Sequence, residues 1–363
     1  MYLTNFVESL LRHTPHEILL FSPDWFESPF PPNQPGLTDI RLKGVPVQQI
    51  GRVLYEQIRY RAFIRLKQPD VYIGLLNSIP LGLRIPSAVF VKSLQYLYVP
   101  KAFGLLRRMY LRLMVQITAR QAHILIVPTQ ATAQDLQQKT GVFPHKIRVL
   151  PEALYTREAN VLQTEQGKEL LLRVRQLTRG TPFILCVGAT YPYKNLDRLI
   201  LAFARLRKRL KSHHVLLLIG GEGGVTRKAL GDIARQAGVE TSVVCAGSRP
   251  YEEVIAAYNL ADMMVMPTLY ETFGHPVLEA MACGCPVVTS NSGSVAEVAG
   301  DAAELVDPLE IESIEAGMYR LLTDGVRRAV LVERGRARAA VFTWEATALG
   351  AHKILMELAT FRQ

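Results

Sequence analysis

Short apolar runs alternate with segments of helical periodicity along most of the chain, and this alternation constrains the fold more than any other feature. Parallel strands need a crossover connection, which is usually a helix, so the alternation predicts an α/β fold with parallel sheets. The predicted strands are Ile18–Phe21, Val71–Leu76, Ala88–Val91, Ile124–Val127, Ile147–Leu150, Phe183–Val187, Val215–Ile219, Ser242–Ala246, Met263–Met266 and Pro286–Thr289. The predicted helices span residues 52–66, 103–121, 131–139, 195–211, 225–237, 251–259 and 276–283.

The length of 363 residues exceeds what one hydrophobic core usually supports, so we expect two domains. Both halves show the strand–helix pattern, which predicts two Rossmann-like domains that face each other across a cleft. We expect one domain over residues 1–165 and the other over residues 166–341. The linker is expected near Glu158–Gly180, where polar residues interrupt the pattern.

The first residues depart from the usual order of such a domain. Apolar side chains at Leu3, Phe6, Val7 and Leu10 have helical spacing, so a helix is predicted almost from the start. A Rossmann-like domain normally begins with a strand and a glycine-rich turn. The first strand of this domain is therefore expected to be missing, either because the sequence is a fragment or has a misassigned start, or because the domain has lost that strand.

Basic residues are concentrated in the first half of the chain. The net charge is +10, from 42 Lys and Arg against 32 Asp and Glu, and residues 1–178 carry 22 of the basic and 12 of the acidic side chains. Residues 179–363 carry 20 of each and are neutral. Such a basic half favours an anionic partner, either a phosphate-bearing acceptor or an anionic membrane surface. Nucleic acid is disfavoured, because no nucleic-acid-binding motif accompanies the charge.

The chain shows no signal for secretion or for spanning a membrane. No apolar stretch approaches the roughly 18–20 residues that cross a bilayer, and the first residues lack the features of a signal peptide. The four cysteines have no spacing typical of a disulfide framework, and Cys283-x-Cys285 lacks the second ligand pair of a zinc site. We therefore expect a cytoplasmic protein, or one peripheral on the inner face of the cell membrane.

The segment over residues 262–308 has the features of a nucleotide-sugar site. A buried strand ends near Pro267, and a helix is predicted to begin around Gly274–Pro276, with Glu271 just before it and Glu279 about one turn inside it. The free N–H groups at a helix start favour phosphate. Two carboxylates beside such a helix suit a ligand with hydroxyl groups on either side of a diphosphate.

This segment strongly resembles the GT-B glycosyltransferases of family 4, also called group 1. Their signature of two glutamates separated by seven residues is present as Glu271-Thr-Phe-Gly-His-Pro-Val-Leu-Glu279-Ala-Met-Ala-Cys-Gly-Cys-Pro-Val-Val. The resemblance implies that Glu271 contacts the hydroxyl groups of the donor sugar, Phe273 and Gly274 the diphosphate, and Glu279 the ribose. It also implies a GT-B architecture in which a final helix, within residues 342–363, crosses back to the first domain.

Three upstream segments extend the resemblance. Val187-Gly188-Ala-Thr-Tyr-Pro-Tyr-Lys194 is similar to the family loop that binds the donor diphosphate, although Ala189 and Tyr193 stand where basic residues are common. Gly221 lies in a glycine cluster that lets a ligand approach, or forms a turn, and Arg249 matches a segment near the nucleobase. The resemblance thus implies Glu271 and Lys194 as catalytic residues, and Gly188, Lys194, Gly221, Arg249, Phe273, Gly274 and Glu279 as donor-binding residues.

The resemblance implies a hexosyltransferase, with mannose or glucose as the donor sugar, that acts with retention on a glycan or lipid-linked acceptor. It implies no cofactor and no metal, and the chain contains no Asp-x-Asp motif. The phosphate-binding features argue against a glycosidase, although a glycosidase would also have a pair of carboxylates in its active site. No G-x-G-x-x-G turn supports an NAD-dependent oxidoreductase.

An alternative is a weakly active or inactive glycosyltransferase-like protein that binds sugar nucleotide or a partner enzyme. It is motivated by Lys92 and Ser93, which stand where many family members have a His-Asp pair near the reacting sugar. The same domain contains two arginine-rich helices, 52–66 and 103–121, which we interpret as packing their apolar sides into the core. Their arginines form a basic face that suits an anionic acceptor or membrane; they are Arg52, Arg59, Arg61, Arg65, Arg107, Arg108, Arg112 and Arg120.

Overall fold

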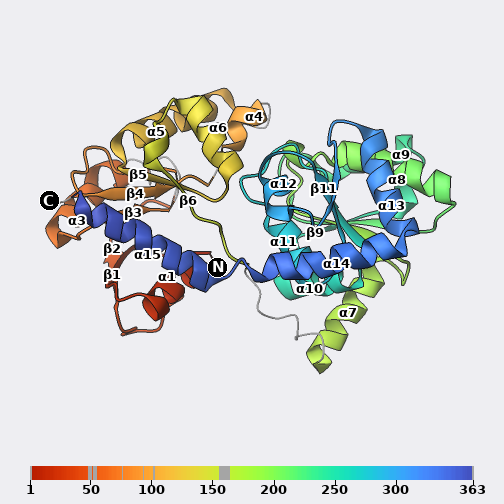
Figure 1. Cartoon of the computed structure of the whole chain (residues 1–363), viewed down its shortest axis with the longest axis horizontal. Coiled ribbons are helices and arrows are strands. Elements are labelled where there is room, and N and C mark those ends of the chain that lie inside the picture. The colour runs from red at the N-terminus through yellow and green to blue at the C-terminus, as the bar shows by residue number, and fades with distance from the viewer. Residues whose placement is uncertain are drawn as a thin grey trace. The chain divides into compact units, whose positions relative to one another are not determined.

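The computed structural model of the protein describes residues 2–47, 51, 55–75, 77–92, 94–100, 103–154 and 164–361. The chain divides into two compact units, which we describe separately (Figure 1). The first unit comprises Met1–Leu94, Leu105–Tyr155 and Phe342–Gln363, and the second comprises Gln95–Gly104 and Thr156–Val341. The first unit therefore combines segments from both ends of the sequence.

The first unit contains two separate parallel sheets. One has the order β3-β4-β5-β6, and the other consists of β1 and β2. The strands are β1 (Ile18–Pro23), β2 (Leu37–Leu42), β3 (Tyr72–Gly74), β4 (Ser87–Phe90), β5 (Ile124–Val127) and β6 (Ile147–Val149). The predicted strands of this half are confirmed, apart from Leu76, which lies outside the described residues, whereas β2 was not predicted from the sequence.

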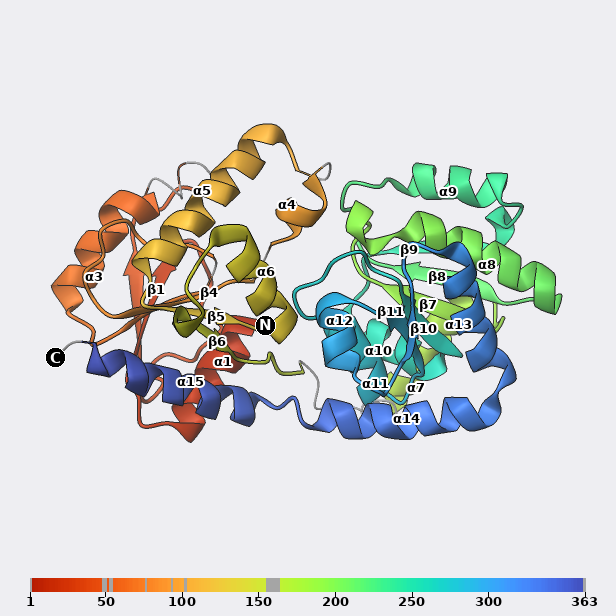
Figure 2. The ribbon, with the colours of Figure 1, turned by 45° about the horizontal axis from the view of Figure 1, so that its top comes forward.

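Helices α1 (Tyr2–His13) and α15 (Trp344–Thr360) pack against each other and against the four-stranded sheet (Figures 1 and 2). Their apolar side chains share one core with β4 and β5, in which Phe6, Phe90 and Leu358 are almost completely buried. The helix predicted at the start of the chain is thus confirmed. The other helical segments of the unit are η1 (Glu56–Tyr60, a π-helical turn), α3 (Arg61–Lys67), α5 (Leu105–Gln121), α6 (Gln130–Thr140) and η3 (Pro144–Lys146).

The interpretation that α5 packs its apolar stripe into the core is wrong. The buried side of α5 is formed by Met114, Val115, Thr118 and Ala119, which have helical spacing. The apolar stripe expected in the core lies mostly on the surface, where Leu106 is 83% exposed; it comprises Leu105, Leu106, Met109, Tyr110, Leu113, Met114 and Ile117. The helix has apolar residues on two sides, and only one of them faces the sheet. The exposed residues of the other side are Leu105, Leu106, Met109, Tyr110 and Leu113.

The second unit contains one parallel sheet with the order β12-β11-β10-β7-β8-β9. Counted within the unit, this is the Rossmann order 3-2-1-4-5-6, and the predicted strands of this half are confirmed. The strands are β7 (Phe183–Val187), β8 (Val215–Ile219), β9 (Val243–Gly247), β10 (Met263–Met266), β11 (Val287–Ser290) and β12 (Glu304–Val306). All of them are short and most are almost completely buried, as expected for a sheet covered by helices on both faces.

Two layers of helices cover this sheet (Figures 1 and 2). One layer contains α8 (Leu196–Leu210), α9 (Arg227–Gln236) and α13 (Ile311–Thr323). The other contains α7 (Glu165–Leu177), α10 (Tyr251–Leu260), α11 (His275–Ala282) and α14 (Gly325–Ala340). The prediction of a linker near Glu158–Gly180 is wrong for residues 165–177, which form α7, and residues 155–163 lie outside the described residues. The remaining helical elements are α4 (Gln95–Tyr98), η5 (Pro192–Lys194), η6 (Glu240–Ser242) and α12 (Gly293–Ala299).

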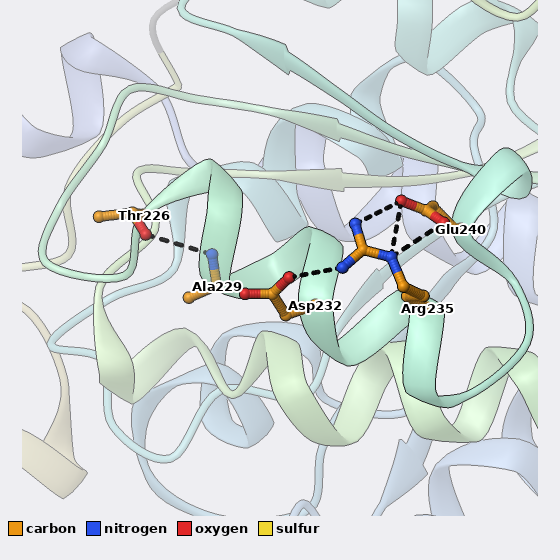
Figure 3. Close-up of polar contacts among 5 residues, drawn as sticks. All are labelled: Thr226, Ala229, Asp232, Arg235 and Glu240. Carbon is orange, nitrogen blue, oxygen red and sulfur yellow. Dashed lines mark hydrogen bonds and ion pairs between the residues drawn. The ribbon is translucent and has the colours of Figure 1, made fainter.

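Local contacts define where α9 begins and ends (Figure 3). The Thr226 hydroxyl accepts a hydrogen bond from the Ala229 N–H at 3.2 Å, which caps the helix start. The Arg235 guanidinium bonds Asp232 at 3.0 Å and Glu240 at 2.8 Å. These charged groups are exposed and contribute little stability. The cap matters more here, because it fixes the helix start directly after the loop that follows β8.

Candidate functional site

The predicted donor-binding residues follow strands that lie next to one another in the second unit. Strands β7 and β10 are neighbours at the centre of the sheet, and the strand order runs in opposite directions on either side of them. Ligands of such sheets bind beyond the carboxyl ends of the strands at this switch point. Lys194 follows β7, and Glu271 follows β10, so both lie at the expected edge.

The Lys194 side chain packs against Gly188, the glycine directly after β7. A Cβ atom on Gly188 would lie 3.0 Å from the Lys194 Nζ, so glycine leaves the space that the lysine side chain occupies. Gly188 also has a φ of 141°, which side chains disfavour. Asn195 anchors the end of this loop, because its Nδ2 donates to the Pro267 carbonyl at 2.9 Å. Lys194 is only 8% exposed as a result.

The glycine cluster after β8 packs directly against the loop after β7. A Cβ on Gly220 would lie 2.0 Å from the Gly188 carbonyl oxygen, so no side chain fits there. Thr190 joins the two loops: its N–H donates to the Gly221 carbonyl at 2.9 Å, and its Oγ1 accepts from the Gly223 N–H at 3.0 Å. The glycine cluster therefore belongs to a hydrogen-bonded contact between the two loops and is not an isolated turn.

Glu271 forms an ion pair with Lys194 at 2.5 Å between Oε1 and Nζ. The side chains are 12% and 10% exposed, so water screens the pair only weakly. The loop that carries Glu271 is tied to the Lys194 loop, since the Thr268 hydroxyl donates to the Tyr193 carbonyl at 2.9 Å. The structure thus brings the two residues predicted as catalytic into direct contact.

Helix α11 begins beside this ion pair. Gly274 precedes it with a φ of 108°, and a Cβ there would lie 2.9 Å from the Val295 side chain. Pro276 occupies the first turn, where a missing N–H costs nothing. Phe273 is 3% exposed and packs with its ring 5.0 Å from that of His275. The backbone of Gly274 therefore has a defined position at the positive end of a helix.

Glu279 lies inside α11 and is held by two tyrosines of α10. The Tyr251 hydroxyl donates to its Oε1 at 3.1 Å, and the Tyr258 hydroxyl donates to its Oε2 at 3.0 Å. Burial raises the pKa of Glu279, while the hydrogen bond from Tyr258 and the nearby His275 act in the opposite direction. Each carboxylate oxygen keeps a further lone pair with which to accept from a ligand.

Neither tyrosine was predicted from the sequence as a residue of the site. Tyr251 and Tyr258 are seven residues apart, which places them on one face of a helix. That spacing was the available signal, but it does not reveal which carboxylate the face meets.

Arg249 forms its contacts with its own loop and with Glu253 instead of with Lys194, Glu271 or Glu279. Its Nε donates to the Ala246 carbonyl at 3.1 Å, and its Nη1 lies 3.8 Å from Glu253. Its side chain is one-third exposed. The guanidinium is thus engaged by its own loop and by the start of α10.

Lys92, in the first unit, is half-buried and forms an ion pair. Its Nζ lies 3.0 Å from Glu152 and 2.7 Å from the centre of the Tyr2 ring. Burial lowers the pKa of Lys92 to about 8, although Glu152 acts to raise it. Ser93, the other residue that departs from the family pattern, lies outside the described residues.

In the described part of the chain, no cluster of three or more His, Cys, Asp or Glu side chains is arranged to hold a metal ion. None of the helices in this part of the chain combines the length and the apolar character that crossing a bilayer requires.

Comparison with known proteins gives matches in both halves. Residues 168–338 match the family described as "Glycosyl transferases group 1", and residues 1–157 match "Glycosyltransferase Family 4". The O-antigen chain mannosyltransferase B of Escherichia coli is 34% identical over 48% of this chain and 46% of its own length. A D-inositol 3-phosphate glycosyltransferase of Corynebacterium jeikeium is 30% identical over 68% of this chain and 60% of its own length. The chain thus matches about half of the length of these curated relatives.

The solved structures include a similar fold. The glycosyltransferase WaaG, described as involved in lipopolysaccharide biosynthesis, superposes with a TM-score of 0.74. The comparison covers 97% of this chain and 94% of WaaG, at 20% sequence identity.

Proposed function

The chain belongs to the group 1 glycosyltransferases of family 4, which have the GT-B fold, and from this we propose that it transfers a hexosyl group from a nucleoside-diphosphate sugar. The acceptor in this proposal is a glycan or a lipid-linked saccharide. The transfer retains the anomeric configuration and needs no metal, in line with the family resemblance. A mannosyl donor is favoured, because the relative that is 34% identical is a mannosyltransferase.

The buried ion pair between Lys194 and Glu271 carries this proposal. An ammonium group has three N–H donors, so Lys194 can bond Glu271 and still donate to a diphosphate oxygen. The N–H groups at the start of α11 add positive potential for the diphosphate as it leaves. Glu271 is held by Lys194 where it would accept hydrogen bonds from the hydroxyl groups of the donor sugar.

The other residues have roles in binding the nucleotide. Glu279 would accept the ribose hydroxyl groups, with Tyr251 and Tyr258 fixing its orientation. Gly188 and Gly221 would allow the diphosphate to approach the backbone of the two joined loops. Arg249 would need to leave Glu253 to reach a base, so we assign it the smallest share of donor binding.

The test is release of nucleoside diphosphate from a panel of nucleotide-sugars, with Lys194→Gln as the site variant. We expect its turnover to fall by about 100-fold to 1000-fold, because the leaving diphosphate loses its cation. Lys168→Gln is a matched control: Lys168 also lies 2.5 Å from a glutamate, Glu165, but that pair is exposed on α7. Undiminished turnover in folded Lys194→Gln would contradict the assignment.

The alternative, a protein that binds sugar nucleotide without turning it over, remains a proposal. It is motivated by Lys92, whose amino group is engaged by Glu152 and Tyr2 instead of standing free. Calorimetry with the same nucleotide-sugars separates the two functions. Binding without product release would favour the alternative, and binding with release favours the transferase.

We also propose that the first unit binds an anionic membrane surface through α5. Four apolar side chains of this helix are more than half exposed: Leu105, Leu106, Met109 and Leu113. Arg107 and Arg112 lie among them in the sequence and are exposed as well. A helix with exposed apolar groups and arginines suits the boundary between lipid headgroups and acyl chains. The helix would thus hold the enzyme near a lipid-linked acceptor.

A further inference from the structure

The two cations among the predicted donor-binding residues both lie beside carboxylates. Lys194 forms its ion pair with Glu271, and the Arg249 guanidinium lies 3.8 Å from Glu253. Glu279 adds a further negative charge when it is ionised. The start of α11 contributes only about half a positive charge. The diphosphate of a nucleotide-sugar carries one negative charge on each phosphate, so these groups together do not match it with positive charge.

His275 is the first residue of α11 and follows Gly274, the predicted diphosphate contact. It is half-buried, and its ring lies 5.0 Å from that of the buried Phe273, which limits where the imidazole can lie. Its Nδ1 is buried, so a ligand would meet the ring at Nε2. A histidine with a defined position therefore lies at the helix start where the diphosphate is predicted to bind.

His275 and Glu279 share one face of α11. They are four residues apart, a spacing that places two helical side chains next to each other. Burial raises the pKa of Glu279, and the groups that act to lower it include Tyr258, His275 and Lys194. His275 and Lys194 act on it through their charge, which requires both to lie near that carboxylate. The face of α11 that carries the predicted ribose ligand thus also carries a histidine at its beginning.

The surroundings of His275 contain few other charged groups. The titratable and charged groups near this face are Glu279, Lys194, Glu271, Tyr251 and Tyr258. On the side of α12, Gly274 meets the apolar Val295, and Arg336 of α14 packs on Gly284, beyond the other end of α11. A diphosphate bound at the helix start would therefore be a strong negative neighbour of the His275 ring.

We propose that the His275 imidazole binds the donor diphosphate in its charged form and takes up a proton from solvent as the donor binds, an inference that rests on the proposed function. Histidine is the side chain whose charge changes near neutral pH, and a negative neighbour favours its charged form. The imidazolium would donate from Nε2 to a diphosphate oxygen, next to the N–H groups at the start of α11. It would supply the positive charge that the engaged Lys194 and Arg249 do not.

The two ionisable residues of this helix face give pH effects of opposite sign. Binding that requires charged His275 takes up a proton, so it weakens as the pH rises. Binding that requires the Glu279 carboxylate releases a proton from any protonated Glu279, so it weakens as the pH falls. The phosphates of a nucleotide-sugar stay ionised throughout this range and add no proton of their own. The direction of the pH effect therefore distinguishes the two residues.

The experiment is calorimetry of guanosine diphosphate mannose and uridine diphosphate glucose between pH 6 and pH 8.5, in two buffers of different ionisation enthalpy. The difference in heat between the buffers gives the number of protons taken up. We expect the parent to take up protons on binding and to lose affinity by about tenfold towards pH 8.5, the value of one hydrogen bond to a charged group. His275→Gln should take up fewer protons, bind about tenfold more weakly than the parent at pH 6, and match the parent at pH 8.5.

His145→Gln is the matched control. His145 also packs its ring beside a phenylalanine, Phe143, at 5.6 Å, but in the first unit. This variant should behave like the parent.

Two results would overturn the inference and leave the proposed function intact. One is equal proton uptake by the parent and folded His275→Gln. The other needs no variant: a parent whose affinity for the donor does not fall as the pH rises to 8.5. A parent that binds no nucleotide-sugar at any pH would overturn the proposed function and this inference together.

Discussion

Two glutamates at the carboxyl edge of the six-stranded sheet are held by different chemistry. Glu271 contacts a cation, Lys194, whereas Glu279 accepts from two neutral hydroxyl groups. Burial raises the pKa of Glu279, although the hydrogen bonds from both tyrosines act to lower it.

We expect Tyr258→Phe to weaken donor binding by roughly tenfold, about the value of one hydrogen bond to a charged group. The hydroxyl of Tyr258 lowers the pKa of Glu279, so its loss raises that pKa further. As the pH falls, Glu279 then becomes neutral at a higher pH than in the parent, and donor binding is lost earlier. Calorimetry of the nucleoside diphosphate between pH 5 and pH 8 measures this shift.

Tyr251→Phe is the comparison for this experiment, because Tyr251 bonds the other carboxylate oxygen and is less buried. A smaller change in the same direction is expected. Identical pH profiles for the parent and Tyr258→Phe would show that Glu279 does not bind the donor as a carboxylate.

At the scale of residues, the sequence predicted the main site residues but not the side chains that they contact. Lys194, Glu271 and Glu279 were found because a long motif fixes their place after a strand or in a helix. Their partners could not be found that way. Whether Arg249 meets a ligand or Glu253, and whether Lys92 is free or paired with Glu152, depends on side-chain geometry that residue spacing does not determine.

At the scale of elements, helix α5 shows a limit of periodicity. Its sequence has apolar residues on two sides, and helical spacing alone does not say which side faces the sheet. The structure buries the side that contains Met114, Val115 and the small residues Thr118 and Ala119. The longer residues, such as Leu106 and Met109, are left on the surface. The strands were predicted more accurately, because a short apolar run fits a buried strand of a parallel sheet whichever of its faces is considered.

We expect charge reversal of Arg107, Arg108 and Arg112 to glutamate to weaken binding to anionic vesicles by about 100-fold or more, at about 1 kcal/mol per arginine. Leu106→Asp should also weaken it, including at low salt, because an inserted apolar group is lost. Co-sedimentation with vesicles of phosphatidylglycerol and phosphatidylcholine measures both effects.

Leu172→Asp is the matched control for the apolar change. Leu172 is 57% exposed on α7 and is followed by Arg173, so it resembles the α5 residues in exposure and charge. It should leave vesicle binding unchanged. If Leu106→Asp and Leu172→Asp behave alike, α5 does not enter the membrane surface.

At the scale of the whole molecule, the chain returns to its first unit after completing the second. Helix α15 supplies Ala348, Ala351, Leu355 and Leu358 to the core that α1 and the four-stranded sheet share. Polar contacts fix its place along the unit: the Ser9 hydroxyl donates to the Trp344 carbonyl at 2.8 Å, and Thr347 bonds the Pro151 carbonyl. The second unit has a core of its own, built on β7, β8 and β10.

We therefore expect a chain that ends at Val341 to lose the fold of its first unit and keep that of its second. Burial of the α15 side chains contributes on the order of 5–10 kcal/mol, which is comparable to the whole stability of a domain. Hydrogen exchange should become fast in residues 124–127 and stay slow in residues 184–187 and 215–219. Loss of protection in residues 184–187 after the truncation would show that the second unit depends on the first for its fold.

We expect Leu355→Ala, at a buried position of α15, to destabilise the first unit by about 2–4 kcal/mol. Met356→Ala, at the exposed neighbouring position, should lower the stability by well under about 1 kcal/mol.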